Sequence, residues 1–256
     1  MAWLERVRQR AAGWAGRGLD LFCPPRCGLC GGEPPPDRDL PPAGVFICPA
    51  CARGIVEDGP RCPRCAGSCP GGACEHCRRG PPPCDGLVVL GGYGDDLRQA
   101  VLRAKRPGAE PVAAALGRLL VHRHRQTFDA WGCAAVVPVP MHWGRRALRG
   151  ASAAEEIGRQ VAADLGLRCR RLLRRVRATR MQNELPFEER GANVRGAFRA
   201  RRSVAGLRIL LVDDVVTTGG TLAECRRALV AAGAAAVHAA VAARAERAAD
   251  TRNEDG

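Results

Sequence analysis

Lysine is almost absent from this chain of 256 residues, because Lys105 is the single lysine among its 40 basic residues. All the others are arginines, and they raise the net charge to +14 against 26 acidic residues. This excess favours phosphate-bearing partners, either nucleotides or nucleic acid, although arginine bias and solubility explain it equally well. Aromatic residues are also scarce, at 4%. The sequence therefore lacks an aromatic-rich surface on which the bases of a single strand would stack.

Signals for membrane insertion or export are missing as well. No run of about 18 uninterrupted apolar residues is present to span a bilayer. The first residues, Met1 to Arg6, place charges where the apolar region of a signal peptide would lie. We therefore expect a cytoplasmic protein without a transmembrane segment. In that reducing compartment, clustered thiols indicate metal ligands rather than disulfides.

Eleven of the 14 cysteines fall in the first third of the chain, and eight of them form four Cys-x-x-Cys pairs. The pairs are Cys27/Cys30, Cys48/Cys51, Cys62/Cys65 and Cys74/Cys77. A two-residue gap lets both sulfurs face one ion, and two such pairs complete a tetrahedral thiolate site with no position open for catalysis. The pattern predicts one or two structural zinc ions. Disulfides and redox-active dithiols are the alternatives, but such dithiols normally occur as one pair beside a β-α-β unit.

Composition divides the chain into four parts. Residues 1–20 alternate apolar residues with arginines at helical spacing, which predicts a short amphipathic helix. Residues 21–84 are rich in Cys, Pro and Gly, so this segment needs metal to fold and is predicted to be a double zinc-ribbon module. Residues 85–245 carry the apolar runs of a larger domain. The polar tail over residues 246–256 is expected to be disordered.

The larger domain alternates predicted strands and helices. We expect strands over residues 87–93, 134–138, 207–212 and 235–243, and helices over residues 95–105, 111–124, 145–165 and 219–232. Such alternation is typical of an α/β fold, in which helices flank a parallel sheet and the crossovers are right-handed.

Two adjacent acids, Asp213 and Asp214, end a predicted strand, and a Thr/Gly-rich turn follows them. Paired carboxylates accept hydrogen bonds from ribose hydroxyls and favour positive charge, either on the sugar or as Mg²⁺. The turn would present backbone N–H groups to a phosphate at the start of a helix. A capped turn is the simpler explanation of a Thr-Gly-Gly sequence, but the combination of strand, acids, turn and helix is specific. The candidate phosphate loop consists of Val215, Val216, Thr217, Thr218, Gly219, Gly220 and Thr221.

This segment resembles the phosphoribosyl pyrophosphate (PRPP) signature of type I phosphoribosyltransferases, and further motifs resemble the ComF family. That family joins a cysteine-rich zinc module to a phosphoribosyltransferase domain. The matching segments are Tyr93 to Lys105, Val137 to His142 followed by Arg149-Gly150, and Arg177 to Phe198. One departure is Ala151-Ser152-Ala153, where the family usually reads Phe-Asn-Gln. On the pyrophosphate side, the candidate residues are Lys105, Val139, Pro140, Arg145, Arg146, Gln182 and Arg190.

The resemblance implies a type I phosphoribosyltransferase fold behind the zinc module, and an enzyme that binds PRPP with Mg²⁺. Asp213 and Asp214 would then be catalytic, and a phosphoribosyl group would pass to a nitrogen acceptor that the sequence does not identify. The family also implies a link to natural competence and DNA uptake. The alternative is therefore a non-catalytic factor that binds single-stranded DNA, uses the pocket to sense PRPP or a nucleotide, and works with a competence helicase-type partner.

Overall fold

A computed structural model of the chain describes residues 26–33, 45–57, 59–70, 74–141, 152–177 and 193–245. The helix expected over residues 1–20 and the tail expected over residues 246–256 lie outside these ranges. None of the described helices is long and apolar enough to cross a membrane.

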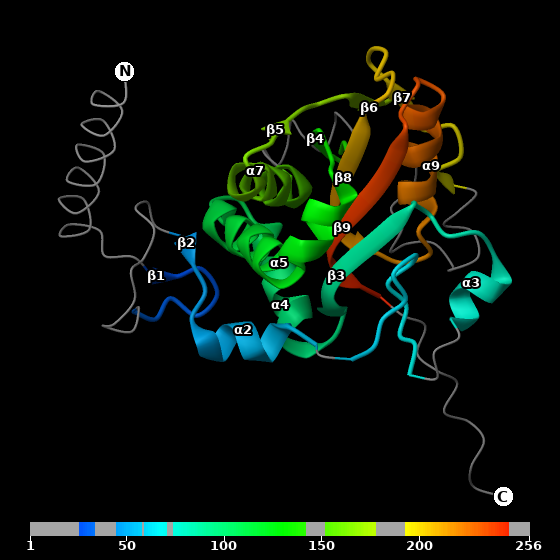
Figure 1. The fold of residues 1–256 in the computed structure, drawn as a ribbon. Coiled ribbons are helices and arrows are strands. Elements are labelled where there is room, and N and C mark those ends of the chain that lie inside the picture. The colour runs from blue at the N-terminus through cyan, green and yellow to red at the C-terminus, as the bar shows by residue number, and fades with distance from the viewer. Residues whose placement is uncertain are drawn as a thin grey trace, which may run out of the picture.

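A five-stranded parallel sheet forms the centre of the described structure (Figure 1). Its strands, in order across the sheet, are β3 (Gly86–Gly92), β9 (Ala236–Arg244), β8 (Arg208–Val216), β4 (Ala135–Pro138) and β5 (Arg168–Cys169). The four longer strands are mainly apolar runs rather than alternating patterns, as expected for a parallel sheet covered on both faces. This arrangement confirms the predicted α/β class.

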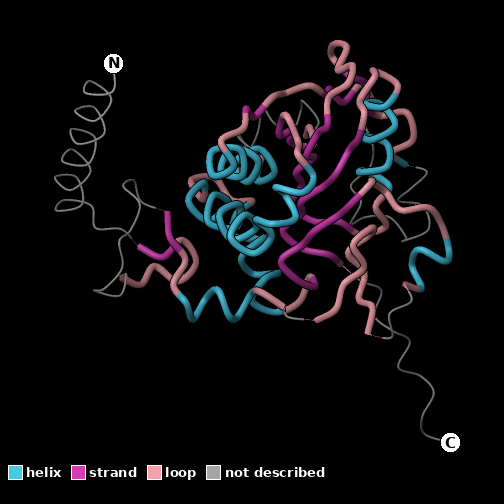
Figure 2. Tube along the Cα trace, in the orientation of Figure 1, coloured by secondary structure: helices cyan, strands magenta, loops and turns pink. Residues whose placement is uncertain are grey.

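Helices cover both faces of the sheet (Figure 2). One face packs against α4 (Asp95–Ala104), α5 (Glu110–Trp131) and α7 (Ala153–Leu165), and the other packs against α9 (Gly220–Val230). Because successive side chains of a strand point to opposite faces, Leu210 and Val212 of β8 join the first core, whereas Ile209 and Leu211 join the second.

Local signals explain where the helices begin and end. Helix α7 begins after Ser152, whose hydroxyl accepts a hydrogen bond from the Glu155 N–H at 3.1 Å. It ends at Gly166, which adopts the left-handed conformation with φ of +67°. Helix α5 continues past its expected end at His124. The chain kinks at this residue, and the helix then resumes and ends at Trp131. Residues 142–151, where we expected the start of α7, are not among the described residues.

Several short elements were not foreseen. An antiparallel pair, β6 (Leu173–Arg175) and β7 (Phe198–Ala200), covers part of the α9 face. The cysteine-rich segment forms β1 (Arg26–Cys27), β2 (Val45–Phe46), α2 (Pro49–Ile55) and α3 (Glu75–Arg79). In Figure 1, β1, β2 and α2 lie on the side of α4 and α5, whereas α3 lies on the side of α9.

The cysteine-rich segment packs directly onto the sheet domain. Cys27, Leu29 and Ile55 are buried in the same core as α4 and α5. At the outer edge of the sheet, the Leu87 N–H of β3 donates to the Pro63 carbonyl at 3.0 Å. The buried Arg244 of β9 donates from Nη1 to the Cys65 carbonyl at 2.6 Å. The segment therefore holds a defined position at the edge of the sheet.

Candidate functional site

The two adjacent acids lie near the carboxyl end of β8, a central strand of the sheet. In parallel sheets, ligands bind in the crevice beyond the carboxyl ends of the strands. Neither acid is buried in a packed core: the Asp214 side chain is 23% exposed, and Asp213 is partly exposed. The single lysine lies beside them, with Lys105 Nζ 3.2 Å from Asp214 Oδ2. Lys105 directly follows α4, so the fold unites two segments that are distant in the sequence.

The electrostatics of this cluster favour an added positive charge. Burial and the neighbouring Asp214 carboxylate raise the pKa of Asp213 to about 8. Burial alone would lower the pKa of Lys105, but the Asp214 carboxylate holds it above its ordinary value. Lys105 is therefore a cation at neutral pH, whereas Asp213 retains a proton that a bound cation would displace. The hard carboxylate oxygens form a donor set that suits Mg²⁺.

The candidate phosphate loop follows the acids without a break. Strand β8 extends beyond its expected end and includes Val215 and Val216, and Gly219 precedes α9. Gly219 has a φ of +81°, and a Cβ there would lie 3.0 Å from the side chain of Pro83, so the position requires glycine. The first turn of α9 contains no acidic residue. Its backbone N–H groups therefore offer an electropositive helix end to an anion.

The turn after β4 lies beside the same edge. Strand β4 pairs with β8, and the Val139 N–H donates to the Val212 carbonyl at 2.9 Å. Val139 is buried and Pro140 is partly exposed. The structure thus brings Lys105, the acid pair, the phosphate loop and this turn to one edge. The other candidates, Arg145, Arg146, Gln182 and Arg190, lie outside the described residues.

Sequence reasoning missed Arg175, in β6. Its guanidinium lies over the Phe198 ring, 5.4 Å from the ring centroid, and its charge lowers the pKa of Asp213 against the effect of burial. It is therefore a second cation near the acid pair. No signal distinguished it in the sequence, because arginines surround it on both sides.

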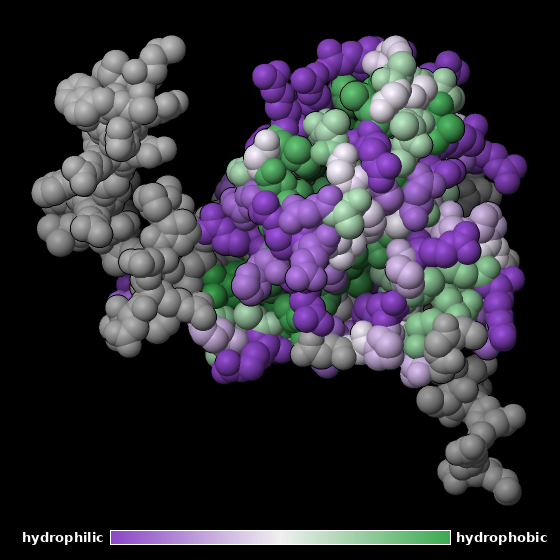
Figure 3. Space-filling view, in the orientation of Figure 1, coloured by the Kyte–Doolittle hydropathy of each residue, from purple (hydrophilic) through white to green (hydrophobic). Residues whose placement is uncertain are grey.

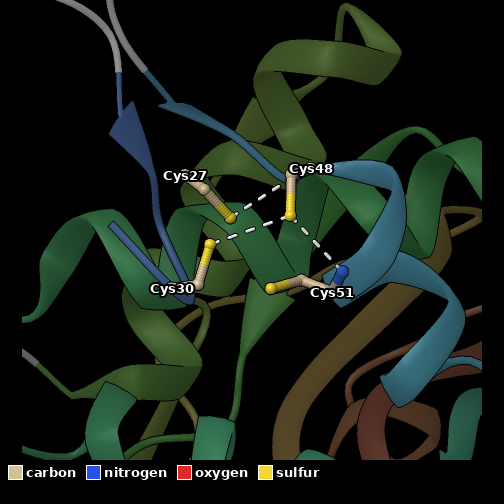
Figure 4. Close-up of side chains that lie close together, drawn as sticks. All are labelled: Cys27, Cys30, Cys48 and Cys51. Carbon is tan, nitrogen blue, oxygen red and sulfur yellow. Dashed lines mark hydrogen bonds between the residues drawn. The ribbon is translucent and has the colours of Figure 1, made fainter. Parts of the chain in front are cut away.

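The eight paired cysteines form two groups of four. The first combines Cys27, Cys30, Cys48 and Cys51, whose side chains converge in Figure 4. The second combines Cys62, Cys65, Cys74 and Cys77. Within each group all sulfurs lie within 4.8 Å of one another. This settles how the pairs combine, which their spacing left open.

The geometry of both groups fits zinc. Two sulfurs of the first group, those of Cys30 and Cys48, lie 3.8 Å apart, and two of the second group, those of Cys65 and Cys74, lie 3.4 Å apart. A tetrahedral ion with zinc–sulfur bonds of about 2.3 Å separates its sulfurs by about 3.8 Å. A disulfide would require about 2.05 Å, and the described cysteines form none. Four thiolates fill the coordination shell, so each group could hold a structural ion.

Backbone N–H groups stabilise negative charge on the first group. The Cys48 N–H donates to Cys27 Sγ at 3.3 Å, and the Cys51 N–H donates to Cys48 Sγ at 3.4 Å (Figure 4). Although burial acts in the opposite direction, such donors lower the pKa of the Cys27 thiol to about 6. Burial and neighbouring sulfurs raise the pKa of Cys51. All four thiols of the group can therefore ionise together only when a cation lies between them.

Comparisons with known proteins agree with this arrangement. A family model described as "Phosphoribosyl transferase domain" matches residues 149–256. The DNA utilization protein YhgH of Salmonella typhimurium is 35% identical over 198 residues, which cover 75% of this chain and 87% of that protein. Competence protein F of Haemophilus influenzae is 29% identical over 192 residues, covering 72% and 83%. Among solved structures, TT1426 from Thermus thermophilus is 19% identical, and the match covers 56% of this chain and 86% of that one. Its TM-score is only 0.31.

Proposed function

The chain belongs to the ComF family, and on this basis we propose that it is a phosphoribosyltransferase of nucleoside metabolism that binds PRPP with Mg²⁺ at the carboxyl end of β8. It transfers the phosphoribosyl group to a nitrogen acceptor. Residues 21–84 form a module that holds two structural zinc ions, and residues 85–245 form the transferase domain. We expect the protein to act in the cytoplasm, where its thiols stay reduced.

Each part of the site has a role in this proposal. The phosphate loop and the N-terminus of α9 hold the 5′-phosphate. Asp213 and Asp214 accept hydrogen bonds from the ribose hydroxyls and stabilise the positive charge that develops on the sugar. Lys105 pairs with Asp214 and places positive charge on the pyrophosphate side, where Val139 and Pro140 form the adjacent turn. Arg145, Arg146, Gln182 and Arg190 are proposed to add contacts on that side.

The reaction is a displacement at the anomeric carbon. The bond from this carbon to the pyrophosphate oxygen breaks, and its electron pair leaves with pyrophosphate. A bond to the acceptor nitrogen forms, and the proton of that nitrogen passes to solvent or to a nearby carboxylate. Mg²⁺ bound with PRPP would neutralise the departing pyrophosphate.

The observation that carries the proposal is the cluster of Lys105 with Asp213 and Asp214 beside a phosphate-type loop. Calorimetric titration with PRPP and Mg²⁺ tests it. We expect the wild type to bind PRPP and the double variant Asp213→Asn/Asp214→Asn to lose binding. Asp164→Asn, which removes a carboxylate paired with Arg118 at 3.5 Å, is a control that should bind normally. No heat from the wild type would refute the proposal. If the wild type binds PRPP, an assay of PRPP consumption with one nucleobase at a time would identify the acceptor.

A second function is favoured by a band of positive charge. The described parts of residues 168–202 contain no acidic residue, and eight arginines there are exposed: Arg168, Arg171, Arg174, Arg177, Arg195, Arg199, Arg201 and Arg202. Figure 3 shows hydrophilic side chains along the upper rim, where β5, β6 and β7 lie. Such a surface suits the phosphates of single-stranded DNA.

In this second proposal the protein handles single-stranded DNA during uptake, together with a helicase-type partner, and uses its pocket to sense PRPP or a nucleotide. The printed names of the two relatives, which refer to DNA utilization and competence, support it. A gel-shift assay across a salt series tests it. We expect a retarded band that disappears as salt rises. Free DNA at the lowest salt concentration would exclude this function.

A further inference from the structure

A cavity of about 580 Å³ lies at the same edge of the sheet, between the cysteine-rich segment and the end of β3. Glu57 and Arg61 line it from the stretch between the two cysteine groups. Gly92 and Tyr93 line it from the end of β3, and Arg244 lines it from the end of β9. Its volume falls within the range of about 300–1,000 Å³ that is typical of small-molecule sites. Nothing in the site described above uses this cavity.

The cavity and the phosphate loop lie at the same level of the sheet. Gly92 of β3 pairs in register with Arg244 of β9, and Arg244 pairs in register with Val216 of β8. Neighbouring strands lie about 4.8 Å apart, so the end of β3 lies about 10 Å from the end of β8. Tyr93 lies close enough to Lys105 for the two side chains to interact electrostatically. A molecule in the cavity would therefore adjoin the site proposed for PRPP.

The cavity presents a fixed hydrogen-bond acceptor. Glu57 Oε2 accepts from the Gly92 N–H at 2.7 Å and from Arg61 Nη2 at 2.5 Å. Among the described residues none donates to the second oxygen, Oε1, and the Glu57 side chain is 54% exposed. These donors lower the pKa of Glu57, although burial acts in the opposite direction. One carboxylate oxygen is thus held in place while the other stays available.

The cavity also presents a buried cation. Arg244 is 3% exposed, and the only hydrogen bond of its side chain to a described residue runs from Nη1 to the Cys65 carbonyl. Its Nε has no hydrogen-bond partner within the described ranges. Leaving a buried guanidinium N–H unsatisfied is costly. The Nε is enclosed by protein, so a carbonyl oxygen in the cavity would accept from the part of this guanidinium that lines the cavity.

We propose that this cavity is the acceptor subsite, and that it takes a planar nitrogen compound whose edge carries an N–H beside a carbonyl oxygen. Lactam nucleobases and carboxamides have such an edge. Glu57 Oε1 accepts from the N–H, and the guanidinium of Arg244 donates to the carbonyl oxygen. A second nitrogen of the compound then faces the acid pair. Because Glu57 and Arg61 come from between the cysteine groups, the zinc module selects the acceptor. The inference rests on the proposed transferase function.

The test uses the full chain loaded with zinc and three probes that carry the required edge: hypoxanthine, uracil and nicotinamide. Purine, which resembles hypoxanthine but lacks the carbonyl, is the matched control ligand. Binding is followed by saturation-transfer NMR and calorimetry. We expect at least one probe to bind to the wild type, and purine to bind about tenfold more weakly than hypoxanthine if hypoxanthine is that probe.

Glu57→Gln should weaken probe binding about tenfold or more, because it removes a charge-assisted hydrogen bond. Asp85→Asn is the matched control variant, since Asp85 also accepts from a backbone N–H (Val237, 2.7 Å) and an arginine (Arg226, 2.7 Å) but does not line the cavity. Both variants should bind PRPP like the wild type. PRPP binding without binding of any probe, or probe binding that Glu57→Gln leaves unchanged, would overturn the subsite alone. Failure to bind PRPP would overturn the transferase itself.

Discussion

Replacing Asp213 with asparagine should stabilise the protein while it abolishes PRPP binding. In the unfolded chain this carboxyl has an ordinary pKa of 3.8, whereas burial and Asp214 raise its pKa to about 8 in the folded state. Between these values the folded state holds a proton that the unfolded state releases, so rising pH favours unfolding. Each pH unit costs the folded state about 1.4 kcal/mol. At pH 7 the cost reaches about 4 kcal/mol, and an asparagine does not incur it.

The measurement is chemical denaturation of the wild type and Asp213→Asn at pH 5, 6, 7 and 8, without PRPP or Mg²⁺. We expect the difference in the free energy of unfolding to grow with pH in favour of the variant, by about 1.4 kcal/mol per unit, and to level off above pH 8. Other carboxylates such as Glu57, Asp85 and Glu224 have lowered pKa values, so the stability they contribute is lost as pH falls. Both proteins share this loss, and it cancels in the difference.

The slope decides the outcome rather than the absolute difference. A constant offset could arise from any local packing change in the variant. If the difference stays flat from pH 5 to pH 8, Asp213 is ionised throughout and the electrostatic description of the site is wrong. A rising difference together with lost PRPP binding would mean that the site trades stability for affinity toward a cation.

Three further predictions follow from the same geometry. Gly219→Ala should weaken PRPP binding about tenfold in calorimetry, because residue 219 has a left-handed backbone. Gly132→Ala, also at positive φ but in open space, should leave PRPP binding unchanged. Equal affinities of the two variants would argue against a phosphate-binding role of the loop. Elemental analysis should find two zinc ions per chain in the wild type and one in Cys65→Ser. Cys169→Ser, which changes an exposed cysteine outside both groups, is the control and should keep two ions. Two ions in Cys65→Ser would show that Cys65 is not a zinc ligand. Lys105→Met should weaken PRPP binding more than Lys105→Arg does, and equal losses would deny the lysine its charge-based role.

Much of the fold follows from local patterns. The expected strand over residues 87–93 corresponds to β3, and the expected helix over residues 95–105 corresponds to α4. The end of β8 was placed too early, because the adjacent aspartates have low strand propensity. The ladder to β9 nevertheless continues through Asp213 and Val215, and backbone pairing outweighs propensity there. Strands β6 and β7 were missed because each has only three residues and includes arginine, so neither shows a recognisable alternation of apolar and polar residues.

The amino-acid sequence by itself determined the elements that depend on neighbours along the chain. The Cys-x-x-Cys spacing places two sulfurs on one ion, and the run from Asp213 to Thr221 places two acids before a helix N-terminus. These features need only short-range geometry, so they can be read without knowing the fold.

Only the tertiary structure decided which distant segments meet. It joined the cysteine pairs two by two, brought Lys105 to within 3.2 Å of Asp214, and formed an open cavity lined by Glu57 and Arg244. Strand order and the docking of the cysteine-rich segment create these contacts, and both follow from the burial of two apolar faces rather than from any local motif. The physical reason is that side-chain proximity across a sheet depends on the order of its strands.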